Sequence, residues 1–449
     1  MKSTHFFDRS VSIAPLVTFR VLFGFIMACS VARFFLKGWI RELYIEPTYF
    51  FTFSGFGWIK PLGALGMYAL FALMFLSAIS IMVGFRYRIA TTLFFISFTY
   101  VELIDKTNYL NHYYFVSLMA FLLIFLPANR RFSIDVWKRP QIYADHVPLW
   151  TISLIKAQLI IVYFFAGLAK LNCDWMIQAM PMKLWLPSLT HIPLVGSIFN
   201  YEETAYVFSW AGAAFDLSIG FLLLLPATRS LAYFAVVVFH TLTALLFPIG
   251  MFPYIMMLST IIFFPSHLHE KCLAFFQKPL RKMPLINTSK SKGQATSRWV
   301  QYAIGFYLLA QIIIPLRYLM YPGSVSWSEQ GYRFSWRVML MEKAGHTTFK
   351  IVDQQGDKVE WATNYRHLTP QQEKMMSTQP DMILQFAHYL RDYYQERGFS
   401  KPQVYCNSKV TLNGRHSQPF IDPAVDLGDV KKTFPPMEWI LPLEDSRRW

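Results

Sequence analysis

Charged residues are scarce in this chain. Asp, Glu, Lys and Arg make up 15% of its 449 residues, hydrophobic residues make up 54%, and the mean hydropathy is +0.31. A soluble domain carries about 25% charged residues, so the composition excludes an ordinary soluble protein. Long apolar runs dominate the sequence instead, and they indicate an integral membrane protein with many spans.

Cysteine is also rare and shows no metal-binding spacing. The four cysteines are Cys29, Cys173, Cys272 and Cys406; none forms a CxxC pair, and Cys29 lies inside an apolar run. This pattern predicts neither a zinc site nor a disulfide framework, and we expect no metal cofactor.

Two further absences narrow the class of protein. The net charge is +15, yet no basic stripe with interleaved aromatic residues lies on a polar helix, so we expect no nucleic-acid binding. The N-terminal sequence MKSTHFFDRS lacks the short apolar stretch and small-residue cleavage site of a signal peptide. We therefore expect the first apolar run to be retained as a membrane span.

Nine apolar runs, bounded by charges or prolines, predict a transmembrane helical domain over residues 1–321, since a span needs about 20 residues. Their connections are alternately rich and poor in Lys and Arg, and the rich ones are expected in the cytoplasm. This predicts a cytoplasmic N-terminus and an outer C-terminus. The runs are Ser12–Leu36, Pro61–Gly84, Ile89–Ile104, Tyr113–Leu126, Pro148–Lys170, Thr204–Leu225, Ser230–Pro248, Met251–Phe264 and Trp299–Tyr321. The basic connections hold Arg86, Arg88, Arg130, Arg131, Lys138, Arg139, Arg229 and the stretch Lys271–Arg298, which includes a predicted flexible linker, KSKGQATS.

The remainder, residues 322–449, is polar and reads as a separate outer domain. Alternating segments such as YRFSWRVML, TTFKIVD, QVYCNSKVTL and EWILPL are typical of short antiparallel strands. The segment PDMILQFAHYLRDYYQERG has apolar residues at helical spacing and predicts one helix. We expect a β-rich, sandwich-like domain on the outer membrane face. The aromatic connections Lys37–Lys60 and Asn172–Glu203 are expected to lie flat in the outer interface, over the helix ends.

Lys170 closes the fifth apolar run, beside Asn172, Asp174 and Trp175. Burial disfavours an ammonium group, so we expect the pKa of this lysine to be lowered. A lysine with a lowered pKa can act as a base near neutral pH. The alternative is a lysine whose side chain merely reaches the lipid headgroups.

The stretch Asp105–His112 is predicted to share the outer end with Lys170. The His112 imidazole can donate to or accept from an oxygen-bearing ring, and Asn111 can hold its orientation; the alternative is an ordinary polar loop. His240 lies inside a span. It is either a functional residue or a core histidine whose hydrogen bonds are satisfied within the protein. Other polar residues inside spans are candidates for function or for interhelical pairing. They are Arg20, Lys156, Gln158 and Asp216.

Several sequence blocks, in order along nearly the whole chain, resemble the vitamin K-dependent γ-glutamyl carboxylase family. The resemblance implies an enzyme that oxygenates a reduced naphthoquinone and uses the resulting strong base to remove a γ-proton from glutamate. The carbanion then captures CO2, and the quinone leaves as its epoxide. The blocks are VELIDKTNYLNHYY, HVPLW…IVYFFAGLAKLNCDW, FDLSIGFLLLLP…RS, FH…LFPIGMFPYIMM, GYRFSWRVML, PQVYCNSKVTLNGR and IDPAVD.

By the same resemblance, Lys170 is expected to be the catalytic base and His112 to support the hydroquinone oxyanion. Asn111 is a further expected contact of the quinol, and His240 is another because it is a polar residue inside a span. The implied cofactors are reduced vitamin K, or a menaquinol-like naphthoquinol, with O2 and CO2. The implied partners are the lipid bilayer and a glutamate-containing exported protein or peptide. The chain resembles compact bacterial members, which implies an inner-membrane protein with a periplasmic C-terminal domain.

Two positions depart from the family pattern: Ala169 stands where a second lysine is common, and Ala424 where an arginine is familiar. Both departures concern peptide carboxylation more than quinol oxygenation. A quinol epoxidase without peptide carboxylation is therefore one alternative. A transporter or lipid-handling protein with a polar path through Asp216, Arg20 and His240 is another, although transporters tend to contain internal repeats and none is evident. A membrane scaffold whose outer domain binds a partner is the third.

Overall fold

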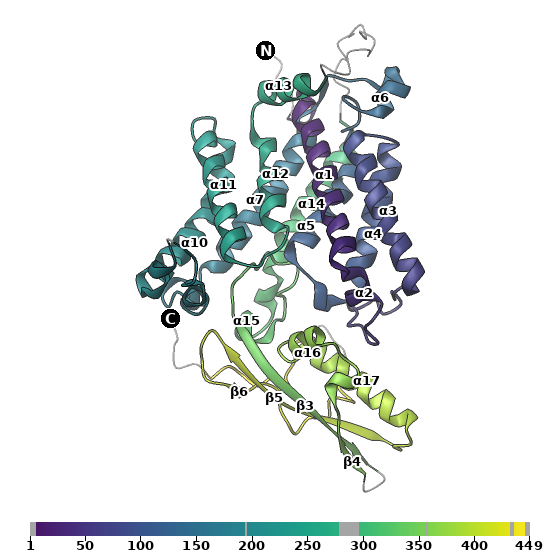
Figure 1. The fold of residues 1–449 in the computed structure, drawn as a ribbon, viewed down its shortest axis with the longest axis vertical. Coiled ribbons are helices and arrows are strands. Elements are labelled where there is room, and N and C mark those ends of the chain that lie inside the picture. Colours follow the sequence, from purple (N-terminus) through teal and green to yellow (C-terminus); the bar gives the residue numbers. More distant parts are fainter. Residues whose placement is uncertain (1–5, 194, 278–295, 355–357, 432–434, 445–449) are drawn as a thin grey trace.

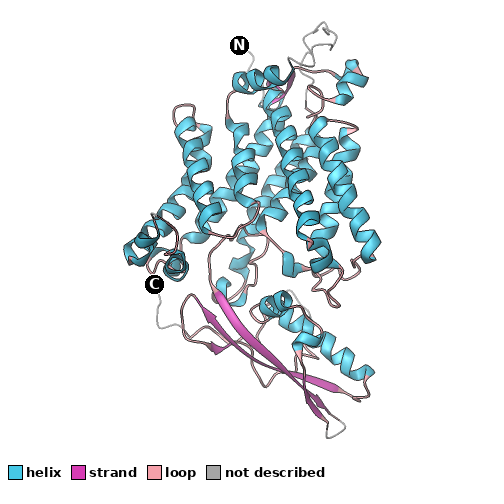
Figure 2. Ribbon diagram, viewed as in Figure 1, coloured by secondary structure: helices cyan, strands magenta, loops and turns pink. Residues whose placement is uncertain are grey.

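The computed structural model describes residues 6–193, 195–277, 296–354, 358–431 and 435–444. These residues form a bundle of helices and, at one end of it, a domain that contains most of the strands (Figures 1 and 2). The chain passes from the bundle to this domain through residues 317–342, after the last long helix of the bundle.

The bundle confirms the predicted polytopic membrane domain, because every predicted span corresponds to an apolar helix. Seven helices are long and apolar enough to cross a membrane, and two apolar helices are shorter. The long ones are α1 (Ala14–Lys37), α3 (Gly63–Val83), α4 (Tyr87–Ile104), α7 (Leu149–Lys170), α10 (Glu202–Leu224), α11 (Arg229–Leu246) and α14 (Arg298–Leu316), which the turn Arg317–Met320 extends. The shorter ones are α5 (Asn111–Phe125) and α12 (Phe252–Thr260), continued by the turn Ile261–Phe263.

The connections differ between the two ends of the bundle. Near the C-terminal domain lie α2 (Trp39–Tyr44), the turn Lys106–Asn108, α8 (Cys173–Met176) and α9 (Met182–Trp185), followed by the turns Leu186–Leu189 and Gly196–Asn200. The opposite end holds α6 (Ile134–Lys138), α13 (Ser266–Gln277) and a two-stranded ribbon of β1 (Ser10–Ser12) and β2 (His146–Pro148). The predicted basic linker KSKGQATS lies mostly outside the described residues, which resume at Thr296.

The C-terminal domain is one antiparallel sheet covered by helices. Its strands are β3 (Lys343–Asp353), β4 (Val359–Trp361), β5 (Pro402–Leu412) and β6 (Gln418–Pro419), in the order β4-β3-β5-β6. The two long strands pair from Lys343 with Leu412 to Asp353 with Pro402. The helix α17 (Pro380–Glu396) packs on the sheet, and Phe386 and Leu390 are buried in one core with Phe349 and Val404. A shorter helix, α16 (Pro370–Met376), precedes it.

This sheet confirms two predicted strands and the predicted helix, but it corrects the expectation of a sandwich. The segments TTFKIVD and QVYCNSKVTL lie within β3 and β5, and PDMILQFAHYLRDYYQERG forms α17. Among the described residues, α17 covers the face where a sandwich would place a second sheet. Alternation in the sequence predicts a strand with one buried face, but it does not tell whether a helix or a second sheet covers that face.

The segment 332–340 is not the predicted strand. It consists of turns in which Phe334, Trp336 and Met339 have positive φ angles. Phe334 and Trp336 pack on Tyr114 of α5, with ring centroids 4.9 Å away in each case. Phe334 and Trp336 therefore both face the bundle because of turns with positive φ angles, and not because of the pleat of a β-strand. The predicted strand EWILPL is reduced to a single bridge between Ile421 and Ile440.

Candidate functional site

An apolar cavity of about 80 Å³ lies among α7, α10, α11 and α12, at the end of the bundle that meets the C-terminal domain. Val338 and Met339, from the wound segment before β3, contribute to its wall. The cavity therefore draws its lining from both parts of the chain. Its polar side chains are Lys170, Asp216, His240, Tyr163 and Thr243.

Lys170 is buried at the last turn of α7 and forms an ion pair with Asp216 of α10. Its Nζ lies 2.7 Å from Oδ2 of Asp216, and the two side chains are only 6% and 9% exposed. The helices approach closely at Gly167, where a Cβ atom would lie 2.6 Å from the backbone nitrogen of Leu217. This close crossing brings the two charges within reach of each other. The amine is therefore not isolated, as the sequence analysis assumed, but shares its environment with a carboxylate.

Trp175 covers the Lys170 side chain from the connection after α7. The Nζ atom of Lys170 lies 5.2 Å from the Trp175 ring centroid, a distance at which a cation is attracted to the ring face. The indole Nε1 donates to the carbonyl oxygen of Ser209 at 2.7 Å. The backbone nitrogen of Trp175 donates to Oδ1 of Asn172 at 3.0 Å. The sequence AKLNCDW thus ends α7 and starts α8, with Asn172 as the N-cap of α8 and Trp175 as the cover of the lysine.

His240 of α11 is buried in the cavity wall and has one free ring nitrogen. Its Nε2 lies 2.9 Å from the hydroxyl oxygen of Tyr163, on α7. Its Nδ1 is buried and has no hydrogen-bond partner among the described residues. Buried polar atoms without a partner are uncommon, and each calls for an explanation such as a catalytic role or a bound water or ion. His240 is therefore only half satisfied as a core histidine.

The structure places His112 behind this cavity and Asn111 at the boundary between the two domains. His112 is buried at the start of α5, with its ring centroid 5.9 Å from that of Phe252, which in turn lies 5.8 Å from His240. Phe252 lines the cavity, and His112 does not. Asn111 donates from Nδ2 to the carbonyl oxygen of Arg337 at 2.8 Å. Of the predicted site residues, Lys170 and His240 therefore meet in one cavity, while Asn111 anchors the neighbouring wound segment.

Further polar contacts fix the C-terminal domain on the bundle. Arg415 forms a bidentate ion pair with Asp174, with nitrogen–oxygen distances of 2.6 and 2.9 Å. Asp381 of α17 contacts Lys106 at 2.6 Å and Arg333 at 2.8 Å. Burial opposes ionisation of Asp381, but the two cations outweigh it and hold the pKa of this carboxyl well below its usual range. These charged contacts lie at the boundary that brings Val338 and Met339 to the cavity.

The other intramembrane charges do not join the site. Arg20 is buried in α1 and donates to the carbonyl oxygens of Ala128 and Phe132. The amine of Lys156 lies 5.5 Å from the Phe263 ring centroid. Neither side chain lines the cavity of Asp216 and His240, so the structure offers no support for a polar path that includes Arg20.

Two features of the cavity were not predicted from the sequence, the pairing of Asp216 with Lys170 and the contact of the Tyr163 hydroxyl with His240. Asp216 was recognised as an intramembrane charge but was not assigned to Lys170. A signal was available, because two opposite charges within apolar runs commonly pair with each other. The contact of Tyr163 with His240 had no comparable signal, since a tyrosine is common in any membrane helix.

Two family models match the chain. Residues 8–267 match the HTTM domain, and residues 296–446 match the lumenal domain of vitamin K-dependent gamma-carboxylase. The chain belongs to the vitamin K-dependent γ-carboxylase family. No solved structure matches it. In this carboxylase-family protein the cavity lies within the part matched by the HTTM domain, and the lumenal domain adds Val338 and Met339 to its wall.

Family membership agrees with the architecture. The first domain supplies the apolar helices of an integral membrane protein, and the second is of a kind named for a lumenal, extracytoplasmic position. Among the described residues no group of three or more His, Cys, Asp and Glu side chains could hold a metal ion.

Proposed function

We propose that this protein is a vitamin K hydroquinone-dependent γ-glutamyl carboxylase, with Lys170 and Asp216 together as the base that activates the quinol. The observation that carries the proposal is the buried ion pair in an apolar cavity closed by a carboxylase lumenal domain. We further propose that this domain is periplasmic, that the N-terminus is cytoplasmic, and that the host membrane is a bacterial inner membrane. The basic connections at the opposite end of the bundle support this orientation.

The residues of the cavity fit a reduced naphthoquinone in chemistry. Its wall is largely apolar, and the free Nδ1 of His240 offers a hydrogen-bond partner for a ring oxygen. The volume of about 80 Å³ is small for a bicyclic ring, so binding requires side chains to move. Three methionines, Met182, Met256 and Met339, line the wall, and methionine adapts readily to a new neighbour.

Lys170 and Asp216 share one proton, which is bound either to the amine or to the carboxylate. In both cases the other group can accept the proton of the quinol. If the amine is charged, the vacant position is a carboxylate oxygen of Asp216; if the amine is neutral, it is the nitrogen of Lys170. A phenolic group has a pKa of about 10 in water. A cation or hydrogen-bond donor near its oxygen must therefore stabilise the oxyanion that remains when the proton leaves. When Asp216 takes the proton, the Lys170 ammonium and the His240 ring can give this stabilisation; when Lys170 takes it, the His240 ring remains.

When bound, the reduced quinone supplies the electrons that, with O2, generate a base strong enough to remove a γ-proton from glutamate. The chain's own contribution is to hold the quinol, take its first proton and exclude water. We propose that His112 also supports the quinol oxygen, which requires Phe252 to move aside, and that Asn111 acts through the wound segment it anchors. CO2 and a glutamate-containing exported protein or peptide complete the proposed reaction.

The test uses the purified full-length chain, reduced vitamin K, a short glutamate-containing peptide and labelled bicarbonate. We expect epoxide formation, oxygen uptake and label in the peptide, all lost in Lys170→Ala. Lys183→Ala is the matched control, because that lysine forms an exposed ion pair with Glu202 on the same side of the protein. Full epoxide formation by Lys170→Ala would refute the assigned base.

The same assay separates the second candidate function, a quinol epoxidase without peptide carboxylation. Ala169 and Ala424, which depart from the family pattern, favour this alternative. Ala424 lies in an exposed turn, and its backbone nitrogen donates to Asp422 at 2.9 Å. Epoxide without label in the peptide identifies the epoxidase. The absence of both products overturns both functions and leaves a scaffold or a lipid-handling protein.

A further inference from the structure

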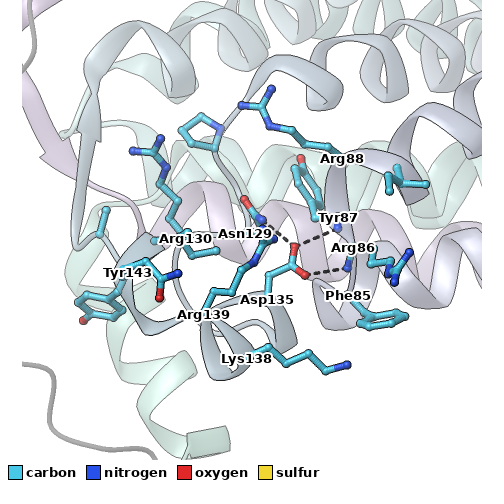
Figure 3. A pocket seen from close by; sticks show the side chains of 15 residues that line it. Phe85, Arg86, Tyr87, Arg88, Asn129, Arg130, Asp135, Lys138, Arg139 and Tyr143 are labelled. Carbon is cyan, nitrogen blue, oxygen red and sulfur yellow. Dashed lines mark hydrogen bonds between the residues drawn. The ribbon is translucent and has the colours of Figure 1, made fainter.

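A large cavity, drawn from close by in Figure 3, lies beside α6 and the start of α4. Figure 1 shows these elements at the end of the bundle opposite the C-terminal domain. The volume of the cavity is about 1160 Å³, and its walls come from the start of α4, the connection after α5, the helix α6 and the turn Pro140–Ile142. The proposed quinol chemistry uses none of its residues.

Cationic side chains surround this cavity, and almost nothing neutralises them. Those that line it are Arg86, Arg88, Arg130, Lys138 and Arg139, and the one carboxylate among the described lining residues is Asp135. Asp135 accepts hydrogen bonds from the backbone nitrogens of Arg86 and Tyr87, at 2.8 and 3.0 Å, and from Nδ2 of Asn129 at 2.8 Å (Figure 3). Its charge thus stabilises the first turn of α4. Within the described part of the chain, none of the five cations forms an ion pair.

The cavity is preformed, because buried contacts hold its floor. The guanidinium of Arg20 donates to the carbonyl oxygens of Ala128 and Phe132, which fixes the connection after α5. Gly84, before α4, has a φ of 67°, and a Cβ atom there would lie 2.4 Å from Cβ of Ser133. The two walls therefore meet at a contact that only glycine permits. The cations at the rim are exposed, but the backbone that carries them is anchored.

The cavity opens beside side chains suited to lipid. Ile89 lines it and is 55% exposed, and Trp137 on α6 is 64% exposed; tryptophan is enriched where membrane meets water. A second cavity, of about 280 Å³, shares Arg88 and Arg130 with the first, and its lining mixes apolar side chains such as Phe125 with polar ones such as Asp8 and His146. An occupant with its charge among the cations can place an apolar part against Ile89 and Phe125.

We infer that this basic cavity binds a phosphate-bearing anion, presented by the headgroup of an anionic phospholipid. Arg and Lys around a pocket between membrane helices suit such headgroups, because each phosphate oxygen accepts charge-assisted hydrogen bonds. The general excess of Lys and Arg in cytoplasmic loops explains the number of cations. That general excess does not explain why cations from several segments surround one preformed cavity. It also does not explain why the carboxylate of that cavity, Asp135, is bonded to backbone nitrogens and not to the cations.

The test titrates the purified full-length protein, in neutral detergent, with short-chain phosphatidylglycerol, short-chain phosphatidylcholine and inorganic phosphate. The cavity variant is Arg88→Ala/Arg130→Ala. The control variant is Lys271→Ala/Arg298→Ala, which removes the same charge from exposed positions outside both cavities. Because one basic residue contributes about 1 kcal/mol to anionic-lipid binding, or roughly 5-fold, we expect the cavity variant to bind phosphatidylglycerol about 25-fold more weakly. The control variant should bind like the wild type.

Each outcome is decisive. Tight binding of phosphatidylglycerol with weak binding of inorganic phosphate supports a lipid source, and equal binding of both supports a free phosphate group in the same site. Equal binding of phosphatidylcholine and phosphatidylglycerol, or equal losses in the two variants, overturns the inference. If the cavity variant fails to fold, the wild type still decides, since binding in this site must weaken as salt screens the cations. Binding of phosphatidylglycerol that ignores salt overturns the inference.

Discussion

Removing Lys170 and Asp216 singly and together tests whether they act as one unit. The variants are Lys170→Met, which nearly keeps the side-chain volume, Asp216→Leu, which replaces the carboxylate by a larger apolar group beside the cavity, and the double variant. Each single change leaves one buried polar group without its partner, because the two side chains are only 6% and 9% exposed. Breaking a buried pair in this way costs about 3–5 kcal/mol, whereas replacing both partners by apolar side chains is often neutral. The double variant should therefore be more stable than either single variant.

Activity should follow a different pattern from stability. A positioned base contributes about 10²–10⁴-fold to a rate, and either single change removes a position that can take the quinol proton. We expect all three variants to lose epoxide formation by at least about 100-fold, including the stable double variant. The assays are thermal unfolding in detergent and chromatographic measurement of the epoxide formed from reduced vitamin K.

An exposed ion pair provides the reference for this cycle. Lys183 and Glu202 are 2.8 Å apart, but their side chains are 22% and 74% exposed. Such pairs contribute about 0–1 kcal/mol, so Lys183→Met should change neither stability nor epoxide formation measurably. A coupling free energy between Lys170 and Asp216 as small as that of this surface pair would show that the two do not act as one unit. The reasoning also fails if Asp216→Leu forms epoxide at the wild-type rate.

Three further predictions concern the cavity and the domain boundary. His240→Phe should raise KM for the quinol about 10-fold, as one hydrogen bond of about 1.5 kcal/mol is lost, and steady-state kinetics would contradict this by an unchanged KM. Asp174→Asn should weaken the bidentate contact with Arg415 by about 1.5–3 kcal/mol, seen as faster proteolysis of the C-terminal domain; wild-type resistance would argue against this anchor. Two cations outweigh the effect of burial and lower the pKa of Asp381 in the folded protein. The contribution of this ionised carboxylate to the free energy of unfolding is therefore present at neutral pH and is lost only as the pH falls through that low pKa. Asp381→Asn should therefore reduce thermal stability at pH 7 and at pH 5 alike, and a loss confined to one of these pH values would refute this.

Hydropathy was sufficient to predict the membrane domain, because each span is a long apolar run between polar connections. It could not predict segment 332–340. There the alternation of Phe334 and Trp336 with Arg333 and Ser335 has the period of a strand, yet the backbone winds through positive φ angles. The aromatic contacts with Tyr114 that favour this winding join residues more than two hundred positions apart in the chain. Tertiary contacts of that kind leave no local signal.

The candidate site was predictable in part for a related reason. Lys170 stands out because an apolar run ends in an amine, and that signal is local. Its partner Asp216 lies 46 residues away on another helix, and which faces of α7 and α10 meet depends on helix rotation. Helices that are apolar nearly all round carry little information about rotation. The close approach at Gly167 decides it here, and glycine within a membrane helix is too common to identify one crossing in advance.

The position of the cavity also bears on how the two family domains relate. The bundle supplies the charges, but Val338 and Met339 come from the connection that leads into β3. Asn111 of the bundle holds that connection through the carbonyl oxygen of Arg337. Asp174 of the bundle holds the C-terminal domain through Arg415. A domain anchored by charged groups at a membrane boundary is positioned more sharply than one that rests on apolar contacts, because hydrogen bonds have direction and apolar contacts do not. The lumenal domain is therefore part of the wall of the cavity, and directional polar contacts hold it there.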